Sequence, residues 1–307
     1  MIGIDVGGAN LKVVDAEGAH VHPCPLWKNA PLENLLRLYK EEPAAVVMTG
    51  ELADCYQNKD EGIRWIVATV KRVFPDAIFY GTDGRFHQDA TSALAAANWL
   101  ASADFLLARH PGSLLVDIGS TTTDIIPLHR REDLMGLSDL IRLQKGYLVY
   151  FGYLRTNIPA FVREITVKGT PTPVSSEYFA ITADVHLLLG DITAKEYTCD
   201  TPDGREPSLE SAGRRIARIV CADPEEIGGV MGVRAAAEQI REAETALVVR
   251  SVRKVEKDSG THGILCAGIG GRYFAPALGA RDLSCDIGIF ADTLPAYAVR
   301  ELALRTG

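Results

Sequence analysis

The sequence predicts an α/β protein of two lobes, with a small α+β lobe inserted in the second. Three observations support this prediction. A glycine-containing hairpin pattern at residues 2–14 has a second copy at residues 114–128. Segments with the apolar spacing of strands and of helices alternate along most of the chain. Residues 152–210 differ, because prolines and polar turns interrupt short strand-like fragments there.

Length and composition exclude several classes of protein. The 307 residues exceed what one small core needs and suit two lobes. The net charge of −8 argues against a nucleic-acid-binding surface. The six cysteines form no C-x-x-C pair, which favours reduced thiols in a cytoplasm. The sequence has no signal-peptide pattern and no apolar run of about 20 residues. We therefore expect a cytoplasmic protein without membrane or nucleic-acid partners; a homodimer is compatible with the sequence.

The first hairpin pattern combines an acid, a glycine turn and a lysine. Asp5 lies near the end of the first strand, Gly7 and Gly8 form the turn, and Asn10 and Lys12 follow it. Glycine lets backbone N–H groups approach an anion closely, so the turn could hold a phosphate. A plain hairpin turn explains one copy equally well. Lys12 could neutralise phosphate charge or be a solvated strand residue.

The second copy repeats the pattern 112 residues later, with Asp117 in the position of Asp5. Asp124 takes the position of Lys12, so the two copies are not chemically equivalent. Turn chemistry alone does not explain two matched hairpins. We predict that Asp5 and Asp117 hold Mg²⁺, which favours one or two carboxylates together with phosphate oxygens. The predicted phosphate cradle consists of Gly7, Gly8, Asn10, Lys12, Gly119, Ser120, Thr121 and Thr122.

A third glycine cluster follows a predicted strand at residues 264–267. Gly268, Gly270 and Gly271 lack the G-x-G-x-x-G spacing of a dinucleotide site. They could let a phosphate-bearing or flat group lie against the backbone, or they could form an ordinary strand-to-helix turn.

Three further acids are candidates for a general base. Glu51 and Asp54 follow a buried strand at residues 44–48, and Asp89 begins an alanine-rich segment, 89–103, that we predict to be a helix. Glu51 and Asp54 could instead be favourable acids at a helix start.

A polar cluster in the inserted lobe fits a structural role better than a metal site. It contains Asp184, His186, Cys199 and Asp203, whose spacing matches no known zinc pattern.

The order of the three glycine-rich segments resembles the phosphate-1, phosphate-2 and adenosine segments of the actin/hexokinase/Hsp70 superfamily. The alanine-rich segment stands where that superfamily has a connecting helix. This resemblance implies two ribonuclease H-like lobes. The first would contain residues 1–84 and about 290–307, the second 85–150 and 211–289, and the inserted lobe 151–210.

A closer resemblance is carried by longer motifs, and these are similar to the hydantoinase/oxoprolinase-related proteins of tetrahydromethanopterin-linked one-carbon metabolism. The motifs are MTGELADC (48–55), AAANW (95–99), GYLRTNIPA (152–160), TADVHLLLGDI (182–192) and YTCDTPDGR (197–205). The family includes a synthase of methanofuran biosynthesis. As the resemblance implies, this transferase joins a furan-methyl diphosphate to the phenol oxygen of γ-glutamyltyramine, or of a tyrosine analogue, and releases diphosphate.

The resemblance implies roles for the candidate residues. Asp5 and Asp117, with bound Mg²⁺, would stabilise the leaving diphosphate, and Glu51, Asp54 or Asp89 would take the phenol proton. Arg155 would bind the glutamyl carboxylate. Asp54 and Asp124 are further candidates for contact with the acceptor, and Asp124 also for metal-bound water. ATP is expected only under an alternative, an ATP-dependent small-molecule kinase or a hydantoinase/oxoprolinase-type hydrolase of the same fold.

Overall fold

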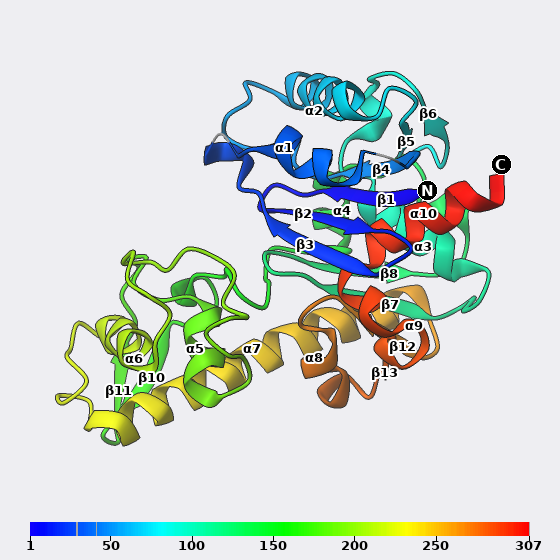
Figure 1. Cartoon of the computed structure of the whole chain (residues 1–307). Coiled ribbons are helices and arrows are strands. Elements are labelled where there is room, and N and C mark those ends of the chain that lie inside the picture. The colour runs from blue at the N-terminus through cyan, green and yellow to red at the C-terminus, as the bar shows by residue number, and fades with distance from the viewer. Residues whose placement is uncertain (29, 41, 307) are drawn as a thin grey trace.

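The first β-sheet is built around the first hairpin (Figure 1). This structure is a computed structural model, and it describes residues 1–28, 30–40 and 42–306. The strands of the sheet are β1 (Ile2–Val6), β2 (Asn10–Val14), β3 (Ala19–Pro23), β4 (Ala44–Met48), β5 (Ile78–Tyr80) and β6 (Phe86–His87). Their order is β3-β2-β1-β4-β5-β6. Strands β1, β2 and β3 are antiparallel neighbours, whereas β1, β4 and β5 are parallel.

The second sheet repeats this arrangement around the second hairpin. Its strands are β7 (Leu114–Ile118), β8 (Thr123–Pro127), β9 (Leu148–Val149), β12 (Ile264–Ala267) and β13 (Arg281–Asp282). Their order is β13-β12-β7-β8-β9. Again three antiparallel strands are followed by two parallel ones, β12 and β13. The shared order confirms the predicted two-lobed α/β fold of the actin/hexokinase/Hsp70 type.

Helices lie between the two sheets and on their outer faces. The middle layer consists of α3 (Asn98–Leu107) and α10 (Leu294–Thr306), whose apolar side chains share one core with both sheets. The outer face of the first sheet is covered by α1 (Leu32–Leu36) and α2 (Lys59–Val73). The outer face of the second is covered by α8 (Gly271–Leu278) and the last part of α7 (Gly229–Ser259). The short helices α4 (Asp139–Lys145) and α9 (Ser284–Ile287) follow β8 and β13.

The alternation of side chains along the strands places the two predicted acids in the same layer. In β1, Ile2, Ile4 and Val6 pack in the outer core, so the intervening Asp5 faces the middle layer. The corresponding alternation in β7 directs Asp117 to the middle layer as well. The two acids therefore approach each other from opposite sheets.

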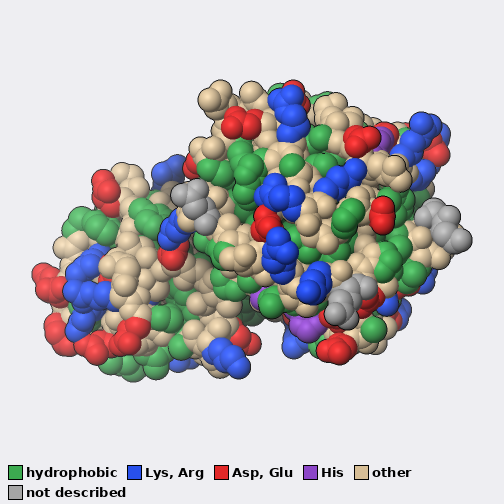
Figure 2. Space-filling view, turned by 45° about the horizontal axis from the view of Figure 1, so that its top comes forward, with side chains coloured by type: hydrophobic (Ala, Val, Ile, Leu, Met, Phe, Trp, Pro, Cys, Tyr) green, Lys and Arg blue, Asp and Glu red, His purple; other side chains and the backbone are tan. Residues whose placement is uncertain are grey.

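The inserted lobe projects from the second sheet (Figures 1 and 2). It contains β10 (Glu164–Val167), β11 (Thr170–Pro173), α5 (Thr182–Leu189), α6 (Leu209–Arg218) and the first part of α7. Its core joins Ile158 and Val185 to Ile216 and Ile240. The packed unit therefore extends beyond residue 210, and α7 connects it to the second sheet.

The alanine-rich segment 89–103 is not one helix, and that prediction was wrong. A 3₁₀ turn, η3 (Ser92–Leu94), precedes an α-helix that begins only at Asn98. The carbonyl of Ala93 accepts hydrogen bonds from the Thr82 N–H at 2.6 Å and the Thr82 hydroxyl at 3.0 Å. Ala96 has a φ of 47°, which interrupts a right-handed helix. Tertiary hydrogen bonds thus outweigh the helix propensity of alanine.

The surface is of mixed charge. Figure 2 shows Lys and Arg side chains interspersed with Asp and Glu on the face that it presents. In the part of the chain that the structure describes, no helix has the length and apolarity needed to cross a bilayer.

Close packing at Gly3 gives a first testable prediction. A Cβ at Gly3 would lie 2.0 Å from the Ala296 carbonyl oxygen of α10. We expect Gly3→Ala to lower the free energy of unfolding by about 1 to 3 kcal/mol, because overpacking must displace α10. Urea denaturation followed by circular dichroism measures this change.

The matched control is Gly213→Ala in α6, where an added Cβ would meet Val233 at an ordinary 3.5 Å. Alanine should raise stability there by up to about 1 kcal/mol. Equal effects of the two substitutions would contradict the packing of β1 against α10.

Candidate active site between the two hairpin turns

The two turns have the same hydrogen bond. The Gly7 N–H donates to the Asn10 carbonyl at 3.0 Å, and the Gly119 N–H donates to the Thr122 carbonyl at 2.9 Å. The next N–H groups in each turn donate to no described residue; they belong to Gly8, Ala9, Ser120 and Thr121. Unpaired N–H groups in consecutive turn residues are a ready site for an anion. The predicted cradle is therefore available in both turns.

Lys12 is the cation of this site. It lies opposite Asp5 in the β1–β2 ladder, and its Nζ is 3.4 Å from Asp5 Oδ2. Burial alone would lower the pKa of Lys12. The carboxylates of Asp5, Asp117 and Asp124 outweigh burial and raise that pKa above its ordinary value. The acids of both hairpins thus surround one partly buried lysine, so Lys12 is not an ordinary solvated strand residue.

Asp5 and Asp117 carry incompletely compensated charge. Burial raises the pKa of Asp5, and Lys12 only partly offsets it. Burial, with the nearby Asp124, Asp5 and Asp292, raises the pKa of Asp117 to about 7. Asp5 Oδ1 is buried and accepts no hydrogen bond from any residue that the structure describes. Two carboxylates with a free buried oxygen fit Mg²⁺, which needs few protein ligands when phosphate oxygens complete its shell. The described residues contain no group of three His, Cys, Asp or Glu side chains placed to hold a metal.

Asp124 is engaged within the protein. Arg142 pairs with Asp124 and, at 2.8 Å, with Asp139. The Arg142 guanidinium also lies 4.4 Å from the centre of the Trp99 ring. The predicted contact of Asp124 with acceptor or metal-bound water remains a prediction.

The third glycine cluster packs against β7. A Cβ at Gly268, whose φ is 79°, would lie 2.4 Å from Asp117 Oδ1. A Cβ at Gly270 would lie 2.6 Å from Ile118 Cγ2. Gly271 begins α8 and donates to the Gly268 carbonyl at 2.8 Å. Close packing beside Asp117 accounts for Gly268 and Gly270; their predicted contact with phosphate remains a prediction.

Arg155 lies next to the second turn and joins it to the first. The backbone N–H of Arg155 donates to the Ser120 carbonyl at 2.9 Å, and the Arg155 guanidinium lies 5.0 Å from the centre of the Trp27 ring. The neighbouring Leu26 N–H donates to the Gly8 carbonyl at 2.9 Å. A bridge between the two turns therefore runs through Trp27, which the sequence reasoning did not identify.

Asp292 is a second residue that the sequence reasoning missed. It lies in the 3₁₀ helix η6 (Gly288–Thr293). The Gly268 N–H donates a hydrogen bond of 2.9 Å to the Ala291 carbonyl of this helix. The charge of Asp292 raises the pKa of Asp117. Burial raises the pKa of Asp292 itself, and Arg272 and Lys12 oppose that rise. The sequence signal is weak, because a single acid before a predicted C-terminal helix is commonplace.

Glu51 is the buried acid beside the first turn. The preceding Gly50 is packed so closely that a Cβ there would lie 3.2 Å from the Gly7 carbonyl carbon. Glu51 is 1% exposed, and its Oε2 has no hydrogen-bond partner among the described residues. Burial raises its pKa to about 7, although a backbone N–H group of Ala96 and the charge of Lys59 oppose the rise. A carboxyl group with this pKa can exchange protons near neutrality.

The other two general-base candidates lie on the surface. Asp54 is exposed, and the Asp89 side chain is 96% exposed. Asp89 lies 3.4 Å from Lys71 of α2, on the outer side of the first sheet. The structure therefore does not bring Asp89 to the turns.

The polar cluster of the inserted lobe separates into two networks. Arg215 pairs with Asp184 at 2.6 Å and with Asp203 at 2.9 Å. His186 instead faces Glu244 at 3.3 Å, and both side chains are fully buried. These contacts suit a structural role in holding α5, α6 and α7 together.

A sequence model of the hydantoinase/oxoprolinase family matches residues 42–288. The chain belongs to this family. The matched region of the hydantoinase/oxoprolinase protein includes Glu51, the second turn and the Gly268 cluster, and the first hairpin lies before it.

Two archaeal relatives are similar over much of the chain, and both are named (4-{4-[2-(gamma-L-glutamylamino)ethyl]phenoxymethyl}furan-2-yl)methanamine synthase. The one from Methanocaldococcus jannaschii is 43% identical over 73% of this chain and 72% of its own length. The one from Methanococcus vannielii is 37% identical over 58% of this chain and 80% of its own length.

Among solved structures, a nucleotide-free acetone carboxylase has a TM-score of 0.49 and 10% identity, over 94% of this chain and 51% of that chain. This likeness is too weak to carry an argument, and the fold assignment rests on the duplicated strand order.

The buried Glu51 carboxyl predicts a pH dependence of stability. Its folded-state pKa is raised from 4.5 to about 7, so the unfolded chain loses this proton first as the pH rises. The free energy of unfolding of the wild type therefore falls between about pH 4.5 and 7. In Glu51→Gln this fall should be smaller, so that the variant gains roughly 1 to 3 kcal/mol over the wild type on going from pH 4 to pH 8. Urea denaturation at both pH values measures the difference. Asp54→Asn, which changes an exposed neighbour, should leave the pH dependence as in the wild type; the same result for Glu51→Gln would show that Glu51 is not a buried acid.

Proposed function

We propose that this protein is a synthase of methanofuran biosynthesis that forms the furan aryl-ether methanamine for which its relatives are named. Its substrates would be (5-(aminomethyl)furan-3-yl)methyl diphosphate and γ-glutamyltyramine, or a tyrosine analogue, with diphosphate as the second product. The relatives' names support the product. The observation that carries the use of a diphosphate is the pair of turns with unpaired N–H groups on either side of Lys12.

The reaction needs stabilisation of a departing anion. The bond between the furan-methyl carbon and the diphosphate oxygen breaks, and its electron pair leaves with the diphosphate. The furan ring can delocalise positive charge from the methyl carbon. Lys12 and the N–H groups of Gly8 and Ser120 would hold the diphosphate as its charge increases. Mg²⁺, held by Asp5 and Asp117, would supply further positive charge at the leaving group.

The phenol must lose its proton as its oxygen bonds to the methyl carbon. Glu51 is the best placed of the three predicted bases, because it lies beside the first turn and has a pKa near neutrality. Its buried site also keeps water from the carboxyl, which favours transfer to the phenol over hydrolysis.

An assay without ATP tests the proposal. With both substrates and Mg²⁺, we expect equal amounts of diphosphate and ether, measured by coupled phosphate detection and mass spectrometry. Lys12→Met and Asp117→Asn should each lower kcat by roughly 100- to 1,000-fold, because each removes a charge at the leaving group. Lys254→Met, which removes an exposed lysine of α7, serves as the matched control.

Absence of diphosphate release from the wild type in the presence of Mg²⁺ would exclude the transferase. Turnover of ATP that depends on an added small molecule would instead support the ATP-dependent kinase or hydrolase.

The role of Glu51 predicts a pH–rate profile. The wild-type kcat should rise with pH through about pH 7, as Glu51 ionises and becomes able to accept a proton. Glu51→Gln should lower kcat by roughly 100- to 10,000-fold and remove this rise. Glu51→Asp, which keeps a carboxyl group, should retain a pH-dependent limb. A Gln variant with the wild-type profile would assign the proton transfer to another group.

A further inference from the structure

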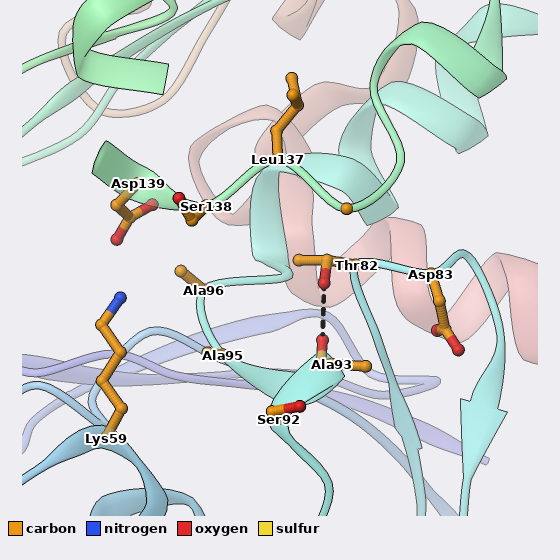
Figure 3. A pocket seen from close by; sticks show the side chains of 11 residues that line it. Lys59, Thr82, Asp83, Ser92, Ala93, Ala95, Ala96, Leu137, Ser138 and Asp139 are labelled. Carbon is orange, nitrogen blue, oxygen red and sulfur yellow. Dashed lines mark hydrogen bonds between the residues drawn. The ribbon is translucent and has the colours of Figure 1, made fainter. Parts of the chain in front are cut away.

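A cavity of about 330 Å³ lies at the carboxyl end of β5 (Figure 3). Its walls come from the start of α2 and from residues 82–83, 92–93, 95–96 and 136–139. Part of this wall is the segment that departs from the predicted helix. Hydrogen bonds join the wall segments to one another. Thr82 donates to the Ala93 carbonyl, and the Gly136 N–H donates to the Thr82 carbonyl at 2.7 Å.

Two opposite charges face each other across this cavity. In Figure 3 the ammonium of Lys59 and the carboxylate of Asp139 point toward one another past Ala96. Lys59 forms no ion pair within 4 Å with any residue that the structure describes. Asp139 pairs with Arg142 through Oδ1. The cavity thus offers a free cation and an anion with one uncommitted oxygen. The exposed Ser92 hydroxyl lies on the same wall as Ala93 and Ala95.

Residues of the cavity wall interact with residues of the proposed reaction site in both lobes. On the first-lobe side, Lys59 and Asp139 both act on the charge of Glu51, which follows the glycine packed on the first turn. On the second-lobe side, Arg142 forms ion pairs with both Asp139 and Asp124. Asp124 lies opposite Asp117 in the register of β7 and β8. Ala96, which lines the cavity, also offers its backbone N–H to Glu51, so the cavity lies beside the proposed base.

We propose that the cavity binds the α-amino-acid end of the acceptor, with Lys59 pairing with the α-carboxylate and Asp139 with the α-ammonium group. This inference rests on the proposed function, because it assigns a place to the glutamyl group of the phenolic substrate. In the product for which the relatives are named, only the glutamyl end has both an ammonium and a carboxylate group. The methanamine end has an ammonium group alone. A cavity with both charges on facing walls is complementary to a zwitterion.

This assignment changes the role predicted for Arg155. Arg155 offers a single positive charge, stacks on Trp27 and lies beside the second turn. It is therefore better placed to support the phosphate-binding turns than to recognise a group of two charges.

The test compares two acceptors that differ only in the proposed contacts. N-butyryltyramine has the phenol, the amide and the chain length of γ-glutamyltyramine, but it lacks the amino and carboxyl groups. We expect Lys59→Met to raise the KM for γ-glutamyltyramine by roughly 10- to 100-fold and to leave the KM for N-butyryltyramine unchanged. Asp139→Asn should act in the same direction. Arg64→Met, an exposed position on the same helix, is the matched control.

A binding measurement separates failure of this inference from failure of the proposed function. γ-Glutamylethylamide has the glutamyl end without the phenol, and calorimetry can follow its binding without any turnover. Weaker binding to Lys59→Met than to the wild type would support the cavity assignment even if no ether forms. Unchanged binding, or no binding to the folded wild type, would overturn it. Ether formation with unaltered acceptor selectivity in both variants would overturn the cavity assignment and leave the proposed function intact. Thermal melts of each variant verify folding.

Discussion

The electrostatic interaction of Lys12 with acids from both hairpins is the constraint on which the site depends. One ammonium group lies among Asp5, Asp117 and Asp124; burial raises the pKa values of all three acids, and Lys12, with Arg142 at Asp124, offsets that rise only in part. A diphosphate adds more negative charge to the same place. Such a ligand can bind only if other positive groups join it, and the unpaired N–H groups and the proposed divalent cation would be those groups. The charge imbalance is therefore an argument for Mg²⁺ that is independent of the family.

The duplicated hairpin was predictable because its information is local. A strand with alternating side chains, an acid on the inner face and a turn of small residues can be recognised in a short segment. Two copies then imply two sheets of the same order, and the sheets have that order. The positions of Asp5, Asp117 and Lys12 follow from register alone. In contrast, Trp27 and Asp292 reach the site through loops whose course depends on distant packing. No pattern around either residue marks it.

The segment before α3 illustrates the other limit of sequence reasoning. Alanine favours helix, and nothing local indicates that Ala93 accepts two hydrogen bonds from Thr82 or that Ala96 takes a positive φ. Departures from local preference are expected where a site requires them. Here the departure forms one wall of the cavity and supplies the Ala96 N–H that acts on Glu51. Ala93 and Ala96, at which the helix prediction was wrong, therefore line the space next to the proposed base.

The proposed displacement of diphosphate by an ATPase-type fold would depend on the parts of the fold that are predicted to recognise phosphate. The turns and Lys12 would contact an anion through backbone N–H groups and charge, and neither requires a nucleoside. Gly268 and Gly270, at the position that resembles an adenosine segment, are already packed against Asp117 and Ile118. Glycine is needed there to admit the neighbouring strand, whether or not a nucleotide binds. The phosphate chemistry of the fold can thus be retained while the organic part of the substrate changes, and the cavity beside Glu51 offers space for that part on the side of the first turn.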